Sequence, residues 1–311
     1  MISTQTAELL AVLQLQQCGN FTRAAEALGL TASALSKTID RLEKRLGTRL
    51  FERSTRRVVT TADGERFIVH ARRIVEDLAE AEADLRAGRN VPRGTLRITV
   101  GTAFGNQLLL PVLPDFMAQY PEVRLALSVT DHLVDVAEAG FDLALRLGPL
   151  GSVDRLVARQ ITALPRKVCA APSYLRRHGT PAHPAELTRH QCLTVADSES
   201  ADQWPFMIDR QRCLIDVGAR LSVDSAESLL SLALAGGGIV RQSAFLLQPA
   251  LDDGRLSEIL LPWRADDTLP LTALYPPGRQ HQAKLTAMLD FLSARFGTET
   301  TRCTDRRTPS S

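Results

Sequence analysis

Residues 21–39 have the sequence Phe21-Thr22-Arg23-Ala24-Ala25-Glu26-Ala27-Leu28-Gly29-Leu30-Thr31-Ala32-Ser33-Ala34-Leu35-Ser36-Lys37-Thr38-Ile39. This stretch predicts two short helices joined by a tight turn. Gly29 follows Leu28 where the first helix must end, and glycine readily takes the left-handed conformation that such ends use. Thr31 offers a hydroxyl that can cap the next helix. Ala24 and Ala25 are small enough to let the second helix cross the first closely.

The second helix has two different faces. Leu35, Ile39, Leu42 and Leu46 are expected on one buried stripe. Small, polar and basic residues lie on the other side and its flanks, namely Ser33, Ala34, Ser36, Lys37, Arg41 and Lys44. Such a face suits the major groove of DNA, where hydroxyls and cations reach base edges and phosphates. The alternative is the solvated face of an ordinary amphipathic helix. Asp40 is awkward beside DNA, and an i,i+4 pair with Lys44 would explain it.

A short hairpin, or wing, is predicted over residues 50–61, where two β-prone runs flank a polar basic turn. Arg53, Arg56 and Arg57 would lie beside phosphates, which arginine can bind in a bidentate way. Part of the basic charge also has structural alternatives, because Arg41 or Arg45 can pair with Glu43 or Glu52.

The N-terminal region resembles the winged helix-turn-helix of LysR-type transcriptional regulators. The residues that carry the resemblance are 21–25, 28–29, 33–37, Ile39, 41–43, 46–47, 49–51 and Arg53. One departure is Ala62-Asp63-Gly64, where the family usually has an adjacent Ala-Gly pair. The helix faces and the resemblance together assign DNA contact to Thr22, Arg23, Thr31, Ala32, Ser33, Ala34, Ser36, Lys37, Arg41, Arg53, Ser54, Thr55, Arg56 and Arg57.

Length and charge agree with several domains, one of them basic. The chain has 311 residues, and residues 1–61 hold nine Lys/Arg and five Asp/Glu, a net charge of +4 on a chain whose total is +2. The five cysteines have no metal-site spacing and are expected to be reduced thiols. No signal peptide or apolar span is visible, which favours a cytoplasmic protein without a membrane partner. Residues 298–311 are expected to be a disordered tail.

A long helix is predicted from Asp63 to Leu85. Its apolar series repeats every three or four residues, as in a coiled coil, through Phe67, Ala71, Ile74, Leu78, Ala81 and Leu85. Charged residues flank the series, which favours self-association over packing on the protein's own surface. In LysR-type proteins this helix pairs two subunits, and two recognition helices on a two-fold axis imply an inverted-repeat site. Residues 88–94, with Pro92, are expected to form a hinge.

Alternating strands and helices follow from Leu96, which predicts α/β lobes with ligand sites at the carboxyl ends of strands. The expected strands are 96–100, 123–130, 141–147, 168–171, 214–217, 220–223, 239–240 and 269–275. The expected helices are 107–120, 133–139, a helix from Pro172, 226–235 and 284–296. The structure of residues 198–212 is left open, because they match the family least well.

This region resembles the LysR effector-binding domain, which is similar to periplasmic binding proteins. Matching residues include 94–97, Leu110-Pro111, Tyr120-Pro121, 140–144, Arg146, 170–175 and 235–239. The resemblance implies two α/β lobes, two crossover strands and a cleft. The expected fold class is therefore α/β with a helix-rich N-terminal domain: DNA-binding domain 1–61, linker 62–90, effector domain 91–297 and tail 298–311.

If the cleft exists, its walls come from strand ends and helix starts. The backbone N–H groups of the loop 101–106 would suit an anion. The expected effector-binding residues are Thr102, Ala103, Phe104, Asn106, Ser128, Thr130, Asp131, Arg146, Gly148, Ser225 and Glu227. The structural alternatives are that Ser225 only caps its helix and that Arg146 only pairs with Asp142 or Asp131. Phe104 indicates an aromatic or apolar effector.

Two other classes of protein fit less well. A solute-binding transport protein would lack the N-terminal DNA-binding pattern. An enzyme would need a motif such as HExxH, GxSxG or a phosphate loop, and the sequence has none. The sequence therefore predicts a regulator without a cofactor or metal, binding double-stranded DNA and a small-molecule effector as a homodimer or homotetramer, with RNA polymerase as a further candidate partner.

Overall fold

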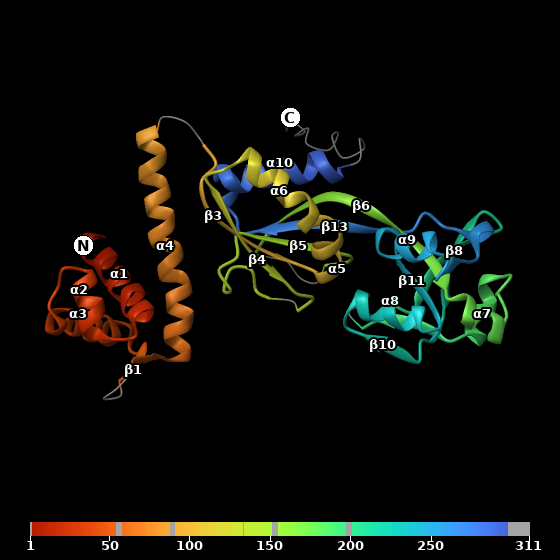
Figure 1. The fold of residues 1–311 in the computed structure, drawn as a ribbon, viewed down its shortest axis with the longest axis horizontal. Helices are drawn as coiled ribbons and strands as arrows, with labels where there is room; N and C mark the ends of the chain where they lie inside the picture. Colours follow the sequence, from red (N-terminus) through yellow and green to blue (C-terminus); the bar gives the residue numbers. More distant parts are fainter. Residues whose placement is uncertain are drawn as a thin grey trace, which may run out of the picture.

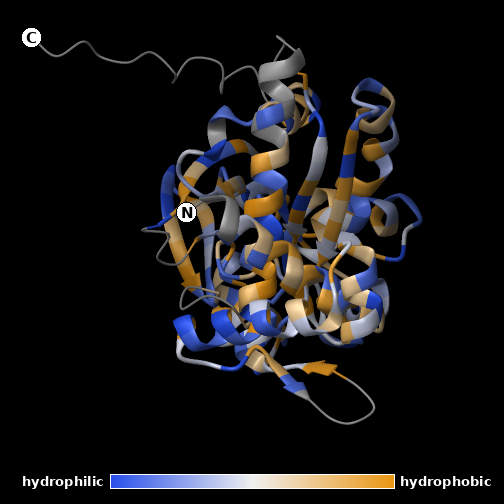
Figure 2. Cartoon of the chain, turned by 90° about the vertical axis from the view of Figure 1, so that its left-hand side faces the viewer, coloured by the Kyte–Doolittle hydropathy of each residue, from blue (hydrophilic) through white to orange (hydrophobic). Residues whose placement is uncertain are grey.

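The computed structural model describes residues 2–53, 58–87, 91–132, 134–150, 155–196 and 201–297. Figure 1 shows a small helical domain at the foot of one long helix, α4, and an elongated two-lobed domain on its other side. Figure 2 shows hydrophobic and hydrophilic residues interspersed along the helices and strands.

The N-terminal domain is a helical cluster with a two-stranded hairpin. It consists of α1 (Ile2–Cys18), α2 (Phe21–Ala27), α3 (Ala32–Leu46), β1 (Phe51–Arg53) and β2 (Val58–Thr60). Its core includes Ala24 and Ala25 of α2 and Leu35, Ile39 and Leu42 of α3. The predicted buried stripe is wrong at its last member, because Leu46 is 38% exposed at the end of α3.

Local signals set the turn between α2 and α3 as the sequence predicts. Gly29 has a φ of +66°, and Thr31 Oγ1 accepts a hydrogen bond from Ala34 N at 3.2 Å. The sequence reasoning missed a second cap: Asn20 Oδ1 accepts from Thr22 N and Arg23 N and starts α2.

The helix α4 (Ala62–Ala87) starts at a close approach to the hairpin. Thr61 Oγ1 caps it by accepting from Gly64 N at 3.0 Å. A Cβ at Gly64 would lie 2.0 Å from the carbonyl oxygen of Leu50, so only glycine fits there. Although Ala62-Asp63-Gly64 departs from the family's adjacent Ala-Gly pair, its glycine lies where the start of α4 approaches the backbone of Leu50.

The two-lobed domain is built on one sheet in the order β10-β7-β11-β6-β13-β5-β3-β4, with β12 paired to β6. The long strands β6 (Val157–Ala170) and β13 (Thr268–Tyr275) run antiparallel and cross between the lobes. We call residues 94–150 and 276–297 lobe I and residues 171–267 lobe II. The two crossover strands expected from the family resemblance are thus present.

Lobe I has parallel pairing of β3 with β4 and β5, and helices cover its sheet. Its core gathers apolar residues of the strands, α6 and α10. The elements are β3 (Gly94–Val100), α5 (Thr102–Phe104), η1 (Gly105–Leu109), α6 (Leu110–Gln119), β4 (Val123–Val129), β5 (Leu143–Leu147), η4 (Arg279–His281) and α10 (Ala283–Phe296).

Lobe II pairs β7 in parallel with β10 and β11, and carries a separate hairpin of β8 and β9. The elements are α7 (Pro172–His178), η2 (Pro184–Arg189), β7 (Cys192–Val195), β8 (Gln203–Ile208), β9 (Gln211–Asp216), β10 (Leu221–Val223), α8 (Ala226–Leu234), β11 (Ile239–Ser243), α9 (Ala244–Asp252), β12 (Ser257–Glu258) and η3 (Leu261–Trp263).

The helix predicted over 133–139 is wrong for its described residues, 134–139. They contain one turn, in which Ala139 N donates to Asp135 O. Asp135 Oδ1 accepts from Ala137 N and Glu138 N at 2.9 Å, so its side chain starts the turn, and Gly140 ends it with a φ of +74°. Leu133, the hinge residues 88–90 and the tail 298–311 lie outside the described residues.

Candidate DNA-binding surface and ligand cavity

The outer face of α3 is open to solvent. Thr22, Arg23, Thr31, Ser33, Lys37 and Arg41 are exposed, and Ala32, Ala34 and Ser36 are half-buried on its flanks. Asp40 accepts a hydrogen bond from Ser36 Oγ at 3.4 Å, so this carboxylate is held within the helix surface. The described part of the chain supplies no ion pair for Lys37 or Arg41. This face therefore combines cations, hydroxyls and small side chains on a rigid support.

Two carboxylates hold α3 in place. Arg45 forms an ion pair with Glu8 of α1, a side chain that is only 5% exposed. Glu43 Oε1 accepts from Leu50 N at 2.8 Å and from Phe51 N at 3.0 Å, which fixes the start of the hairpin to the end of α3. Arg45 is therefore structural, with Glu8 as its partner instead of Glu43 or Glu52.

The wing follows directly from this junction. Phe51 pairs with Thr60, and Arg53 pairs with Val58, in an antiparallel register. Arg53 ends β1, so it stands where the predicted basic turn begins. Ser54, Thr55, Arg56 and Arg57 lie outside the described residues.

The predicted seam of α4 changes character along its length. Ala71 is 1% exposed, and the neighbouring Ile68 and Phe67 pack in the core of the N-terminal domain. Ile74 is 53% exposed and Leu78 is 40% exposed. The first part of the seam therefore packs on its own protein, and Ile74 and Leu78 form an uncovered apolar pair.

Two carboxylates of α4 contact lobe I through ion pairs. Arg97 of β3 forms a bidentate pair with Glu76, at 2.7 and 2.9 Å, and this bond raises the pKa of Arg97. Arg279 of η4 bridges Asp77 of α4 and the buried Asp142 of lobe I. Burial first, and then repulsion from Arg279, lowers the pKa of Arg73. These contacts attach α4 to lobe I.

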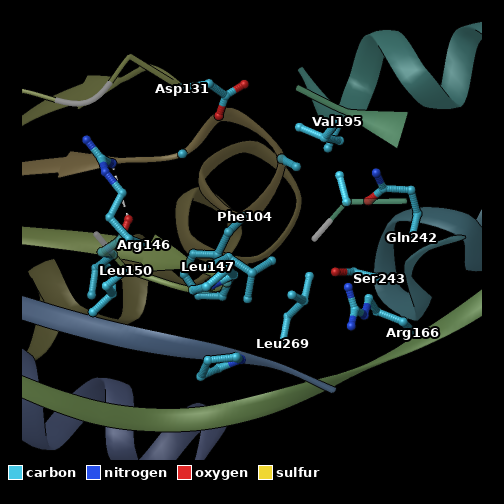
Figure 3. A pocket seen from close by; sticks show the side chains of 18 of the residues that line it. Phe104, Asp131, Arg146, Leu147, Leu150, Arg166, Val195, Gln242, Ser243 and Leu269 are labelled. Atoms are coloured by element: carbon cyan, nitrogen blue, oxygen red, sulfur yellow. Dashed lines mark hydrogen bonds between the residues drawn. The ribbon is translucent and has the colours of Figure 1, made fainter. Parts of the chain in front are cut away.

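A cavity of about 1080 Å³ lies between the two lobes. Five predicted effector residues line it, namely Ala103, Phe104, Asp131, Arg146 and Gly148. Thr102, Asn106, Ser128, Thr130, Ser225 and Glu227 are not among its lining residues. Figure 3 shows Asp131, Arg146 and Leu150 on one side and Gln242, Ser243 and Arg166 on the other, with Phe104, Leu147 and Leu269 between them.

The loop predicted to bind an anion already holds a carboxylate. Asp131 Oδ1 accepts from Thr102 N at 2.8 Å, and Asp131 Oδ2 accepts from Thr102 Oγ1. An external anion at this N-terminus would therefore meet a like charge.

Several of the remaining predicted residues bond to one another or to their own backbone. Asn106 Nδ2 donates to Glu227 Oε1 at 3.1 Å and so joins lobe I to lobe II. Ser225 caps α8 by accepting from Ser228 N, as its structural alternative states. Thr130 Oγ1 accepts from His132 N at 3.2 Å.

Arg146 is a cation of the lobe I wall. Its Nη2 donates to Thr99 Oγ1 at 2.9 Å and to His132 O at 3.5 Å. Burial lowers the pKa of Arg146, and the nearby Asp131 opposes that shift. Asp142, a partner considered from the sequence, instead accepts from Arg279 and from Arg97 N.

The lobe II wall contains residues that the sequence reasoning missed. Arg166 and Arg241 share the carboxylate of Asp267, and Gln242 and Ser243 end β11 beside them. No motif marks these residues, because strands far apart in the chain bring them together. The antiparallel pairing of β6 with β11 makes these residues neighbours, and no spacing in the sequence indicates that pairing.

Other classes of site find little support in the described residues. Cys18, Cys169, Cys192 and Cys213 are free thiols. Burial raises the pKa of both Cys169 and Cys192 to about 12, so they are poor nucleophiles. Within the described ranges no cluster of three metal-ligating side chains occurs, and no helix is both long and apolar enough to span a membrane.

Comparison with known proteins agrees with this architecture along the whole chain. Residues 6–65 match the family model of bacterial regulatory helix-turn-helix proteins of the lysR family. Residues 89–297 match the LysR substrate binding domain. The transcriptional regulator CrgA of Neisseria meningitidis is 34% identical over 296 residues, covering 95% of this chain and 98% of its own. The activator TtdR of Escherichia coli is 29% identical and covers 92% of each chain.

The fold also matches solved structures. The crystal structure of CrgA from Neisseria meningitidis aligns with a TM-score of 0.59 at 34% identity, over 94% of this chain and 99% of that one. Full-length AphB of Vibrio cholerae aligns with a TM-score of 0.56 at 23% identity, over 93% and 98% of the two chains, and supports the fold alone. The helix-turn-helix, the linker helix and the two-lobed domain thus occur in the order of the matched family, and the chain is a LysR-type transcriptional regulator.

Proposed function

We propose that this regulator binds an inverted-repeat operator in double-stranded DNA, with one α3 helix in each half-site. The observation that carries the proposal is the outer face of α3, where Ser33, Lys37 and Arg41 stand exposed on a helix fixed by Arg45 and Glu43. Ser33 and Lys37 are assigned to base edges, and Arg41 to a neighbouring phosphate.

The flanking residues set the register of α3 on the DNA. Phosphate contact is assigned to Thr22, Arg23 and Thr31 near the N-termini of α2 and α3, and to the wing residues Arg53, Ser54, Thr55, Arg56 and Arg57. Ala32, Ala34 and Ser36 let the backbone of α3 approach the groove closely. The wing assignments rest on the sequence pattern.

Two copies of α4 provide the two-fold symmetry. The uncovered Ile74 and Leu78 supply the apolar seam; Glu76 lies on the opposite face of α4, and Asp77 lies beside the seam. Dimerisation through this seam therefore leaves the Glu76–Arg97 pair with lobe I accessible. A homotetramer through the effector domains and contact with RNA polymerase extend the same proposal, as does a cytoplasmic location beside the target DNA.

A small molecule in the interlobe cavity controls the dimer. Ala103, Phe104, Asp131, Arg146 and Gly148 line the cavity, and Thr102, Thr130 and Ser225 hold its loops and a helix start through hydrogen bonds. Asn106 and Glu227 join the lobes directly, so ligand-driven movement of the lobes would strain or favour this bond. The ligand shifts the population between arrangements that differ in their fit to DNA.

The DNA-binding part can be tested once operator fragments have been selected from random DNA. Lys37→Ala should change the preference at one position of each half-site, by about 1–3 kcal/mol. Arg124→Ala is the matched control, because Arg124 is an exposed arginine of lobe I and should leave binding unchanged. If Lys37→Ala bound every sequence as the unmodified protein does, α3 would not be the reading helix.

A further inference from the structure

Two polar side chains of the lobe II wall are buried without a protein partner. Gln242 is 6% exposed and Ser243 is 2% exposed, and both line the interlobe cavity. Neither side chain makes a hydrogen bond with any residue that the structure describes. Their polar atoms therefore open onto the cavity, where a ligand can use them as hydrogen-bonding groups.

Ser243 also stands at the start of α9, a helix of nine residues. It occupies the N-cap position without making a capping bond through its side chain. The first N–H groups of a helix have no partner within the helix, and this end carries partial positive charge. A ligand with negative charge would satisfy both the helix end and the Ser243 hydroxyl.

Arginine side chains adjoin Ser243 on the same face of the sheet. Arg166 of β6 is the direct cross-strand partner of Ser243 in the antiparallel ladder, and opposite residues project to the same side. Arg241 lies two residues before Ser243 on β11 and therefore shares that side. Figure 3 shows Arg166 next to Ser243 at the edge of the cavity.

The cations exceed the carboxylates at this wall. Arg166 and Arg241 share the single carboxylate of Asp267. Burial, followed by repulsion from Arg241, lowers the pKa of Arg166. Arg166 donates to Asp267 through Nε and Nη2, which leaves Nη1 available. An incoming anion would relieve the repulsion and use this donor.

The middle of the cavity has the opposite character. Phe104, Leu147 and Leu269 lie between the two polar walls. On the lobe I wall, Asp131 already accepts a hydrogen bond from Thr102 N, and its negative charge would repel an anion there.

We propose that the cavity takes an organic carboxylate with an apolar body, bound with its carboxylate at Arg166, Ser243 and the N-terminus of α9. The apolar body lies against Phe104, Leu147 and Leu269. This inference rests on the proposed ligand-binding role of the cavity and moves the anion site from the loop 101–106 to lobe II.

The test uses acid–amide pairs on the full-length protein. Benzoate, 3-phenylpropionate and octanoate are each titrated calorimetrically beside their primary amides. At least one acid should bind about ten-fold tighter than its amide, because bonds to a charged acceptor are stronger than neutral ones. Arg166→Gln should remove most of this preference, while Arg241 still pairs with Asp267. Ser243→Ala should weaken acid binding without lowering the melting temperature of the free protein, because it breaks no internal bond.

The matched control is Arg146→Gln on the opposite wall, which should keep the preference for the acid. The proposal is overturned if acids and amides bind equally, or if Arg146→Gln removes the preference and Arg166→Gln keeps it. If an acid and its amide bound equally and both changed the affinity for the operator, the carboxylate site would be excluded but the proposed control by a small molecule would still hold. If none of the six probes binds, the carboxylate site is overturned, and operator affinity on the same preparation still tests the DNA-binding function.

Discussion

Arg279 Nη2 donates to Asp77 Oδ2 at 2.7 Å, and this bond ties the linker helix α4 to lobe I. The same guanidinium pairs with Asp142, whose side chain is 3% exposed. Arg279 therefore serves two carboxylates in different surroundings, one half-exposed and one buried.

Removing Arg279 should destabilise the protein far more than removing Asp77. Arg279→Gln leaves Asp142 as an unpaired buried charge, which costs about 3–5 kcal/mol. Asp77 is 39% exposed, so Asp77→Asn should cost no more than about 1 kcal/mol. Urea unfolding followed by circular dichroism gives both values. Equal losses would mean that the buried pair contributes no more than the exposed one.

A charge in the uncovered seam of α4 should separate the subunits. Leu78→Lys places an ammonium where a second α4 would bury an apolar side chain, and sedimentation velocity should show a monomer. Ala79→Lys is the control, because Ala79 is exposed on the same helix but lies away from the seam. A dimer that survives Leu78→Lys would exclude this face as the interface.

A methyl group at Gly64 should weaken the junction between the hairpin and α4. Its Cβ would meet Leu50 O at 2.0 Å and Thr60 Cγ2 at 2.7 Å, and we expect Gly64→Ala to cost about 3 kcal/mol. Gly47 has a φ of +71° but open space around it, so Gly47→Ala should cost about 1 kcal/mol. Denaturant unfolding compares the two variants. The reverse order would show that the junction relaxes freely.

The buried thiols should resist alkylation in the native protein. The pKa of Cys169 and Cys192 is raised to about 12, so almost no thiolate forms at pH 8, and burial excludes the reagent. Iodoacetamide should label Cys213 and Cys18, which are half-buried, well before the other two. Peptide mass spectrometry measures the order. Early labelling of Cys169 would indicate opening of lobe II.

Local signals allowed the N-terminal domain to be predicted well. Gly29, Thr31 and the stripe Leu35, Ile39, Leu42 act over a few residues, and the structure keeps each of them. Leu46 departs because it lies at the last turn of α3, where no neighbouring element covers it. The family resemblance also placed the lobes and the crossover strands correctly.

Two strands, β6 and β8, and the helix α9 were missed wholly or in part by the sequence reasoning. Only residues 168–171 were expected as a strand, yet β6 runs from Val157 because β13 pairs with it across the lobes. Residues 198–212 were left open because they match the family least well, and the structure pairs β8 in this segment with β9. No helix was expected over α9, which contains Pro249.

The cavity could be predicted only in part. Phe104 follows β3 and Arg146 lies near the end of β5, where ligand sites are expected, and both line the cavity. Ser243 and Arg166 become neighbours through the register of two strands distant in sequence. No spacing in the sequence carries that register, so the lobe II wall needed the structure.

The path of the chain makes lobe II an insertion within lobe I. Both β3 and α10 belong to lobe I, whereas β6 leaves for lobe II and β13 returns. Among the described residues, Glu76 and Asp77 of α4 form ion pairs with Arg97 and Arg279, both in lobe I. The helix α4 and lobe I therefore form one connected unit, and lobe II is joined to this unit by the two crossover strands β6 and β13. Under the proposed ligand control, a movement of lobe II on these two strands would leave α4 and lobe I in place on the DNA and would be presented to a neighbouring subunit by lobe II.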